Sequence, residues 1–307
     1  MKYSTFNYKA LLAIIVGIML GAFQASTFAA EAGIVTGGTQ GTYYAFGNDI
    51  KRTCSGLQQF NVLESAGSLS NIERVLGNPD SQYGIVQQDA LLYKTMDGTQ
   101  PDAKKTKEKL KMIFPLYNEE IHVLVPANSP LNSLQALAGK KVVVGVNGSG
   151  NWVTAQIMQA KTEIAWLPVE IAPQEAVKQP GAFDAIIAVG GKPLSYLRND
   201  PNWKLISISH PALEGFYSNT SIPEGTYAGS KTRVNTYGVK SILVTFDYKN
   251  QFQQEIAQLT QCIATKLAGG GGTGTHAKWR EVDPSTYTEV KWPVSPIALR
   301  YLTKQAK

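Results

Sequence analysis

The sequence predicts an α/β protein folded into two lobes. Short apolar runs alternate with segments of helical spacing along most of the chain, as in sheets whose strands are joined by helices. Glycine-rich turns follow predicted strands and open predicted helices at 37–42, 66–70, 148–151 and 190–192. Two of these turns fall in the first third of the chain and two in the middle third. Because ligands of open α/β sheets bind beyond the strand ends, the turns predict two lobes that face a common cleft.

The first thirty residues predict a secretory signal peptide. Lys2 and Lys9 precede an apolar stretch from Ala10 to Phe23, and small residues suited to cleavage follow it. The stretch is short for a membrane span, although an uncleaved N-terminal anchor is the alternative. The rest of the chain is therefore expected to be exported.

The first part of the exported chain alternates strands and helices. Runs rich in β-branched and aromatic residues predict strands, and apolar residues at helical spacing predict helices. In order, we expect a strand at 32–38, a helix at 42–57, a strand at 60–67, a helix at 68–79, a strand at 81–89 and a helix at 89–96. The lysine-rich stretch 104–111 is expected to be a solvated helix face.

The alternation continues in the rest of the chain. Residues 110–127 predict two strands around a polar turn, because Glu119 and Glu120 interrupt an apolar stretch. Strands are then expected at 142–146, 185–189, 203–209 and 236–246. Helices are expected after the glycine turns at 148–151 and 190–192, the second with Leu194 and Leu197 facing inward, and at 251–269.

Composition and motifs argue against several functions. Cleavage before Glu31 would leave 27 basic against 23 acidic side chains, a mild excess, and no aromatic-basic interleaving points to nucleic acid. The glycine turns lack the spacing of a dinucleotide fingerprint and the lysine of a P-loop. Ser149 is flanked by asparagines where a nucleophile elbow needs glycines. His122 lies in an apolar strand and is interpreted as structural. We therefore expect no catalytic residues, no metal site and no cofactor.

Cys54 and Cys262 are the two cysteines of the chain. In an oxidising compartment they can pair and tie the N-terminal part of the chain to the C-terminal part. Two buried free thiols are an equal alternative, because sequence spacing does not give the geometry of a bridge.

Ligand capture is the function that remains. Helix N-termini present unpaired N–H groups that suit a carboxylate or phosphate, and nearby hydroxyls add hydrogen bonds. The turns supply hydroxyls at Thr39, Thr42, Ser65, Ser68, Ser70 and Ser149, and glycines that let a ligand approach the backbone. Tyr43, Tyr44 and Trp152 can wall a pocket. The alternative for any single turn is that it only begins a helix.

The sequence resembles the TAXI family of substrate-binding proteins, the receptor subunits of tripartite ATP-independent periplasmic (TRAP) transporters. The matching segments include TGGTQGTYYAFGNDI, ESAGSLSNIERV, YGIVQQDALLY, NGSGN and FDAIIAVGG, in the family's order, and they cover nearly the whole exported chain. The resemblance implies a two-lobed periplasmic-binding-protein-like type II fold in the periplasm. Lobe one would comprise residues 31–125 and 226–307, and lobe two residues 126–225.

The same resemblance implies a monomer that binds a small organic anion, such as glutamate, glutamine or a related carboxylate, and passes it to TRAP membrane subunits. It implies ligand-binding residues Thr39, Gly41, Thr42, Tyr43, Ser65, Gly67, Ser68, Asn71, Gln88, Asp89, Ser149, Gly150, Asn151, Trp152 and Gly190. Asn151, Trp152 and Lys192 depart from the family pattern. Lys192 is either a surface lysine or a second anion contact.

Two other functions are compatible with these residues. The first is a secreted binding module that feeds a membrane sensor rather than a transporter. The second is a secreted enzyme that depends on Ser149 or Asp89.

Overall fold

One ten-stranded sheet runs through the described part of the chain, with strands in the order β2–β1–β3–β10–β4–β7–β5–β6. Strand β8 (Trp203–Leu205) pairs with β4, and β9 (Ser218–Ile222) pairs with β10. The computed structural model describes residues 31–96, 98–100, 102–249 and 252–305. The predicted signal peptide lies outside these residues. No helix within the described ranges is long and apolar enough to cross a membrane.

Parallel strands followed by helices form both ends of the sheet. At one end, β1 (Ala32–Val35), β2 (Phe60–Leu63) and β3 (Tyr83–Gln87) precede α2 (Thr42–Cys54), α3 (Ser68–Gly77) and α4 (Gln88–Thr95). At the other end, β5 (Lys141–Val143), β6 (Leu167–Val169) and β7 (Ala185–Gly190) are parallel, and α6 (Gly150–Thr162) joins β5 to β6. The predicted α/β class is confirmed.

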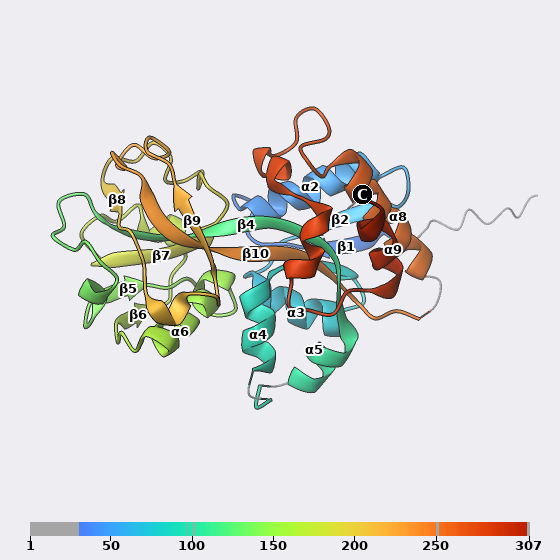
Figure 1. Ribbon diagram of the computed structural model, residues 1–307, viewed down its shortest axis with the longest axis horizontal. Coiled ribbons are helices and arrows are strands. Elements are labelled where there is room, and N and C mark those ends of the chain that lie inside the picture. The colour runs from blue at the N-terminus through green and yellow to red at the C-terminus, as the bar shows by residue number, and fades with distance from the viewer. Residues whose placement is uncertain (1–30, 97, 101, 250–251, 306–307) are drawn as a thin grey trace, which may run out of the picture. The chain divides into compact units, whose positions relative to one another are not determined.

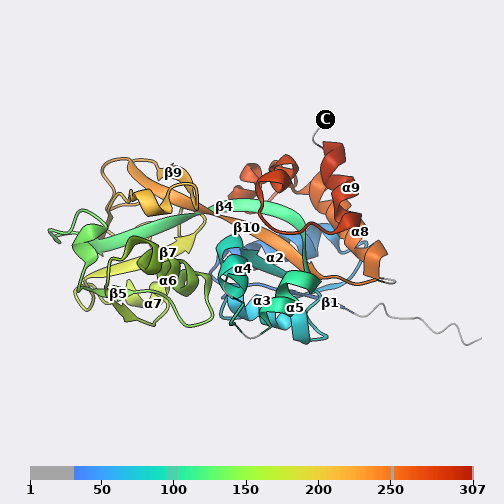
Figure 2. The same cartoon turned by 60° about the horizontal axis from the view of Figure 1, so that its bottom comes forward.

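Two long antiparallel strands, β4 (Leu110–Pro126) and β10 (Val234–Phe246), connect these ends and lie side by side (Figures 1 and 2). The first half of β4 and the second half of β10 lie toward β3, which pairs with β10 at 241–245. The second half of β4 pairs with β7 at 120–124. The strands pair with each other where they pass between the two ends, with Glu119 opposite Val239.

The polar turn predicted inside 110–127 is wrong, because β4 is continuous. Glu119 and Glu120 are 3% and 1% exposed, within the strand. Neighbouring strands on both edges satisfy the backbone there, and the two side chains find partners on opposite faces. The two glutamates therefore lie inside the molecule rather than in solvent.

The helix predicted after 190–192 is also wrong. The segment 191–199 forms bends and turns instead. The backbone N–H groups of Lys192 and Leu194 donate to Glu120 and to the Tyr227 hydroxyl, so side chains of distant segments rather than a helix satisfy the backbone here. Leu194 and Leu197 are nevertheless buried, as predicted. The apolar pattern thus predicted burial correctly, but it predicted the wrong secondary structure.

The remaining elements complete the two ends. They are α5 (Ala103–Lys109), α7 (Pro173–Ala176), α8 (Phe252–Lys266), α9 (Pro296–Gln305) and the 3₁₀ helices Gln135–Leu137, Pro211–Leu213, Ala277–Glu281 and Pro284–Glu289. Cys54 at the end of α2 and Cys262 on α8 form a disulfide. The bridge joins an early helix to a late one and lies among buried apolar side chains.

Candidate ligand-binding site

A cavity of about 510 Å³ lies where the turns after β1, β2 and β5 meet the middle of β4. Turns from both ends of the sheet line it, as expected for a cleft at strand ends. Of the predicted binding residues, ten line the cavity: Thr39, Gly41, Thr42, Tyr43, Gly67, Ser68, Ser149, Gly150, Asn151 and Gly190. Residues distant in sequence are thus brought to one place by the fold.

Five predicted binding residues do not line the cavity: Ser65, Asn71, Gln88, Asp89 and Trp152. Asn71 is buried and donates from Nδ2 to the carbonyls of Thr36 and Ile85, at 2.6 and 2.7 Å. The Ser65 hydroxyl lies 2.8 Å from the same Thr36 carbonyl. These two side chains hold the strand ends from which the lining turns depart, so they support the cavity from behind.

Gln88, Asp89 and Trp152 also have partners elsewhere. The Gln88 amide oxygen accepts from the backbone N–H of Lys291 at 3.4 Å, and Trp152 Nε1 donates to Glu170 at 2.8 Å. Asp89 Oδ2 accepts from the hydroxyls of Thr154 and Tyr217, at 2.7 and 2.9 Å. Burial raises the pKa of Asp89 to about 6, although these two bonds oppose the shift. Asp89 therefore joins α4 to α6 behind the cavity.

The N-termini of α2 and α6 open onto the cavity with free amide groups. Gly41 precedes α2 and offers no side-chain cap, and Thr42 and Tyr43 form the start of its first turn. Ser149 caps α6 by accepting from the Trp152 N–H at 3.1 Å, which leaves the N–H groups of Gly150 and Asn151 without that cap. Both ends carry the partial positive charge of a helix N-terminus. Together they can hold one carboxylate from two directions.

The N-terminus of α3 was predicted to bind an anion, but it hydrogen-bonds to a backbone carbonyl of the protein instead. The N–H groups of Leu69 and Ser70 donate to the Gly148 carbonyl at 3.1 and 3.4 Å. We call these two bonds the α3–Gly148 contact. It joins the turn after β2 to the turn after β5, on the two sides of the cavity. The α3 terminus therefore holds the two turns together, and a carbonyl occupies the place where an anion was expected.

Glu119 on β4 forms the floor of the cavity, and it was not among the predicted binding residues. Its Oε1 accepts from the Tyr43 hydroxyl at 2.5 Å, and its Oε2 accepts from Gln87 Nε2 at 3.1 Å. Burial raises the pKa of Glu119 to about 7, although the bonds from Tyr43 and Gln87 lower it in part. The other amide atom of Gln87, Oε1, has no hydrogen-bond partner among the described residues. The floor is therefore rich in acceptors.

Glu120, next to Glu119, faces away from the cavity and is paired. Lys278 Nζ lies 2.9 Å from its Oε1, and Lys192 Nζ lies 2.7 Å from the same atom. Burial alone would raise the pKa of Glu120, but the two lysines lower it below the usual value. Lys192 was expected to be either a surface lysine or a second contact for the anion. It is neither, because it pairs with the buried carboxylate of Glu120 instead.

The side chains that line the cavity are more acidic than basic. Glu64, Glu119 and Glu175 line the cavity, and no Lys or Arg does so within the described ranges. His276 also lines it, and burial lowers the pKa of this imidazole, which favours its neutral form.

A signal for Glu119 was present in the sequence, because no glycine or proline separates Glu119 and Glu120 from the β-forming residues after them.

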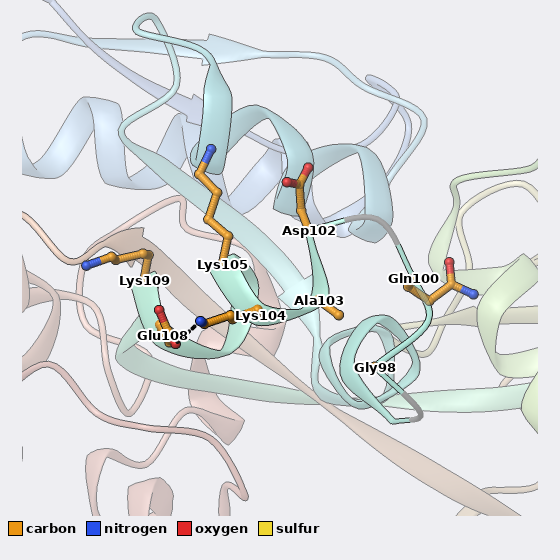
Figure 3. A pocket seen from close by; sticks show the side chains of 8 residues that line it. All are labelled: Gly98, Gln100, Asp102, Ala103, Lys104, Lys105, Glu108 and Lys109. Atoms are coloured by element: carbon orange, nitrogen blue, oxygen red, sulfur yellow. Dashed lines mark ion pairs between the residues drawn. The ribbon is translucent and has the colours of Figure 1, made fainter.

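A second, open pocket lies on α5 (Figure 3) and involves the predicted lysine-rich face. Lys104, Lys105 and Lys109 are exposed, and Lys104 Nζ lies 4.0 Å from Glu108. Exposed pairs of this kind contribute little. The stretch is a solvated helix face as predicted, and the pocket presents no buried polar group.

His122 is a satisfied structural histidine, as interpreted from the sequence. Its Nδ1 lies 2.8 Å from the Glu120 carbonyl and its Nε2 lies 2.8 Å from the Tyr227 hydroxyl. Burial lowers the pKa of His122 to about 4, so the ring is neutral. The described residues contain no cluster of His, Cys, Asp or Glu arranged to hold a metal ion.

Comparisons with known proteins agree with this architecture. Residues 34–304 match the model of the NMT1-like family. A structure of the periplasmic binding protein BugD is similar with a TM-score of 0.54 at 10% identity, covering 90% of this chain and 93% of BugD. A structure described as a periplasmic transporter has a TM-score of 0.50 at 13% identity, covering 77% of this chain and 83% of the other. At such identities the likeness concerns the fold, and it confirms the predicted two-lobed type II fold.

Proposed function

Since the chain belongs to the NMT1-like family and has a periplasmic-binding-protein-like fold, we propose that it is a periplasmic solute receptor that serves a TRAP transporter. The proposed solute is a small organic anion, namely an amino acid such as glutamate or glutamine, or a related carboxylate. The fold is consistent with a solute receptor. The solute class and the TRAP partner rest on the cavity and on the resemblance to TAXI receptors.

The observation that carries this proposal is the pair of helix N-termini at the cavity. The first turns of α2 and α6 come from opposite sides and both line it. A carboxylate between them would accept from backbone N–H groups, and the hydroxyls of Thr39 and Thr42 lie in the same lining. The volume of about 510 Å³ suits a small molecule.

The enzyme alternative has less support. The Ser149 hydroxyl accepts the N–H of Trp152, and Asp89 is bonded to Thr154 and Tyr217 outside the cavity lining. A nucleophile needs a base within hydrogen-bond reach. Neither side chain is arranged in this way.

The proposed lobes meet along β4 and β10. One core cluster draws only on residues 32–117 and 243–302 and another only on residues 124–234, while a third contains residues from both ranges. The predicted boundary at 125 lies next to these limits, whereas the predicted boundary at 226 lies within the second cluster, which includes Tyr227 and Val234. We place the crossing where β4 and β10 pair, at 118–120 and 238–240, because the sheet partners of both strands change there. Closure of the lobes about this crossing would bury the solute.

Thermal unfolding with a panel of solutes tests the receptor function. Binding to the folded state alone raises the melting temperature in a concentration-dependent way. We expect such a rise with at least one amino acid or organic acid for residues 31–307. A well-folded protein that shows no shift with any anionic solute contradicts the proposal.

Thr42→Trp tests whether the solute lies on the α2 terminus. An indole at this position would fill the space beside the first-turn amides, so we expect a loss of affinity of at least about tenfold, or about 1.4 kcal/mol. Thr265→Trp is the matched control, because Thr265 is exposed on α8 away from the cavity. Isothermal titration calorimetry measures both, and unchanged affinity in Thr42→Trp contradicts the placement.

Solute uptake tests the transporter partner. Proteoliposomes that contain TRAP membrane subunits should take up the bound solute only when this protein is added. Binding without any effect on uptake favours the membrane-sensor alternative.

A further inference from the structure

Two neighbouring carboxylates on β4 have opposite surroundings. Glu119 and Glu120 point to opposite faces of the strand, as consecutive residues in a strand do. Both are almost fully buried. Burial of a carboxylate is costly unless charge or hydrogen bonds compensate for it. The partners of each carboxylate therefore show whether the protein alone offsets the cost of burying it.

Glu120 is compensated within the chain. Lys278 Nζ lies 2.9 and 3.1 Å from its two oxygens, and Lys192 contributes both Nζ at 2.7 Å and its backbone N–H at 2.8 Å. Two cations and several donors thus surround one carboxylate. Nothing further is needed from a ligand on this face of the strand.

Glu119 is compensated only in part. Tyr43 and Gln87 each donate one bond, both from neutral groups. A carboxylate can accept about four hydrogen bonds. No lysine or arginine of the described chain lines the cavity into which Glu119 faces. The side chain is therefore an acceptor at the bottom of a cavity without its own counter-charge.

The other groups near Glu119 do not supply this charge. Tyr43 on α2 and Tyr117 on β4 are neutral phenols whose pKa values burial raises. Asp89 on α4 and Glu120 on β4 are acidic and raise the pKa of Glu119 further. His276, in the same cavity, has a pKa lowered by burial. Among the described residues, the hydrogen bonds of the Glu119 side chain come from Tyr43 and Gln87, and neither is a cation.

We propose that Glu119 accepts a hydrogen bond from an ammonium group of the solute, so that the receptor selects molecules that carry an ammonium group beside their carboxylate. This inference rests on the proposed receptor function and narrows its solute class. Tyr43 links the two subsites, because it belongs to the first turn of α2 and also donates to Glu119. One small solute can therefore place its carboxylate on the helix termini and its nitrogen on Glu119.

Matched solute pairs test the inference by calorimetry. The probes are L-glutamate against glutarate, L-glutamine against glutaramate, and L-alanine against propionate, each pair differing by the amino group. At about pH 8 we expect the aminated member of the pair that binds to be at least about tenfold tighter. Equal or tighter binding of the deaminated member overturns the inference and leaves the receptor function intact. Absence of binding by all six probes counts against both.

The pH dependence in the unaltered protein gives a second readout that needs no variant. The Glu119 carboxyl is mostly protonated below its pKa of about 7 and can then donate to a carboxylate. Affinity for an aminated solute should rise as pH increases through about 7, because the ionised Glu119 is the better acceptor. Affinity for a deaminated dicarboxylate should fall over the same range. The same direction for both classes overturns the inference.

Glu119→Gln and its control complete the test. We expect Glu119→Gln to remove the preference for the aminated member and to weaken its binding by at least about tenfold, with little change for the deaminated member. Glu224→Gln is the control, because Glu224 is exposed and outside the lining. A preserved preference in a folded Glu119→Gln protein overturns the role of Glu119.

Discussion

At the scale of single residues, the surroundings decide what each carboxylate does. Glu119 and Glu120 are identical in chemistry and adjacent in sequence, yet burial raises the pKa of one and two lysines lower the pKa of the other. Asp89 shows a third outcome, since hydroxyls of Thr154 and Tyr217 hold it between two helices. Buried carboxylates with raised pKa values are common at functional sites. Only Glu119 among these three also lines the cavity.

Glu119 should lower the stability of the solute-free protein at neutral and alkaline pH. Burial raises its pKa from 4.5 to about 7, so the folded state holds a proton that the unfolded chain releases. The free energy of unfolding therefore falls as pH rises across this window, by about 3 kcal/mol from this group. Glu119→Gln should remove this part of the pH dependence. Urea unfolding at about pH 4.5 and about pH 8 measures it.

The fall that remains in Glu119→Gln should come from Asp89, whose pKa burial raises from 3.8 to about 6. Glu224→Gln should follow the unaltered protein at every pH, because its side chain is exposed. If the stability curves of Glu119→Gln and the unaltered protein run parallel, the carboxyl does not titrate in this way.

At the scale of elements, the start of α3 depends on one glycine. Gly67 has φ +125°, a backbone conformation that side chains oppose, and a Cβ there would lie 3.1 Å from Ser149 Cα. This close approach lets the N–H groups of Leu69 and Ser70 reach the Gly148 carbonyl. The glycine in the predicted turn thus serves the α3–Gly148 contact between two turns, rather than direct access of a ligand to the backbone.

Gly67→Ala should destabilise the protein by about 1–3 kcal/mol, because it adds backbone strain and pushes Ser149 away. Gly77→Ala in the same helix is the matched control, because a Cβ there meets nothing within 4 Å. It should be neutral or stabilise the protein by about 0.5–1 kcal/mol through helix propensity. Chemical denaturation of the two variants compares them. Equal effects would show that Gly67 has no special backbone role.

Local elements were largely predictable, and their exact extent was less so. The strand–turn–helix units at β1–α2, β2–α3 and β5–α6 were expected, because apolar periodicity and glycine turns act over a few residues. Strand β4 was predicted as two strands, since its continuity depends on pairing with β10 and β7. The segment after Gly191 was predicted as a helix because buried leucines occur there at helical spacing. Burial by the fold, rather than a helix, explains that spacing.

At the scale of the whole molecule, the C-terminal part of the chain contacts elements from its N-terminal part. Cys54 on α2 and Cys262 on α8 are joined across 208 positions of sequence. Lys278, in a 3₁₀ helix, reaches Glu120 across 158 positions, and Trp279 beside it donates to Asp49 across 230. The C-terminal segment therefore packs on elements formed by the first half of the chain. Loss of either cysteine should weaken this arrangement.

Replacing both cysteines by alanine should lower the free energy of unfolding by about 5 kcal/mol. The unfolded chain gains the conformational freedom of a loop of about 200 residues, and the chain-entropy model gives this magnitude. Both sulfurs lie in side chains that are at most 3% exposed, so alanine also leaves a small void. Urea unfolding with and without reductant compares the variant with the unaltered protein. Identical unfolding in both proteins would show that the bridge adds no stability.

Periodicity and turn chemistry are local properties, so the α/β class and most strand–turn–helix units were predictable from the sequence. Ten of the residues that line the cavity were also predicted, through the resemblance to TAXI receptors. The free helix N-termini and the residue that forms the cavity floor depend on how distant segments pack together. Tyr43 and Glu119 are 76 positions apart, and the α3 terminus receives a carbonyl from a distant turn. Such partners are chosen by strand pairing and packing between remote segments, and no local pattern encodes them.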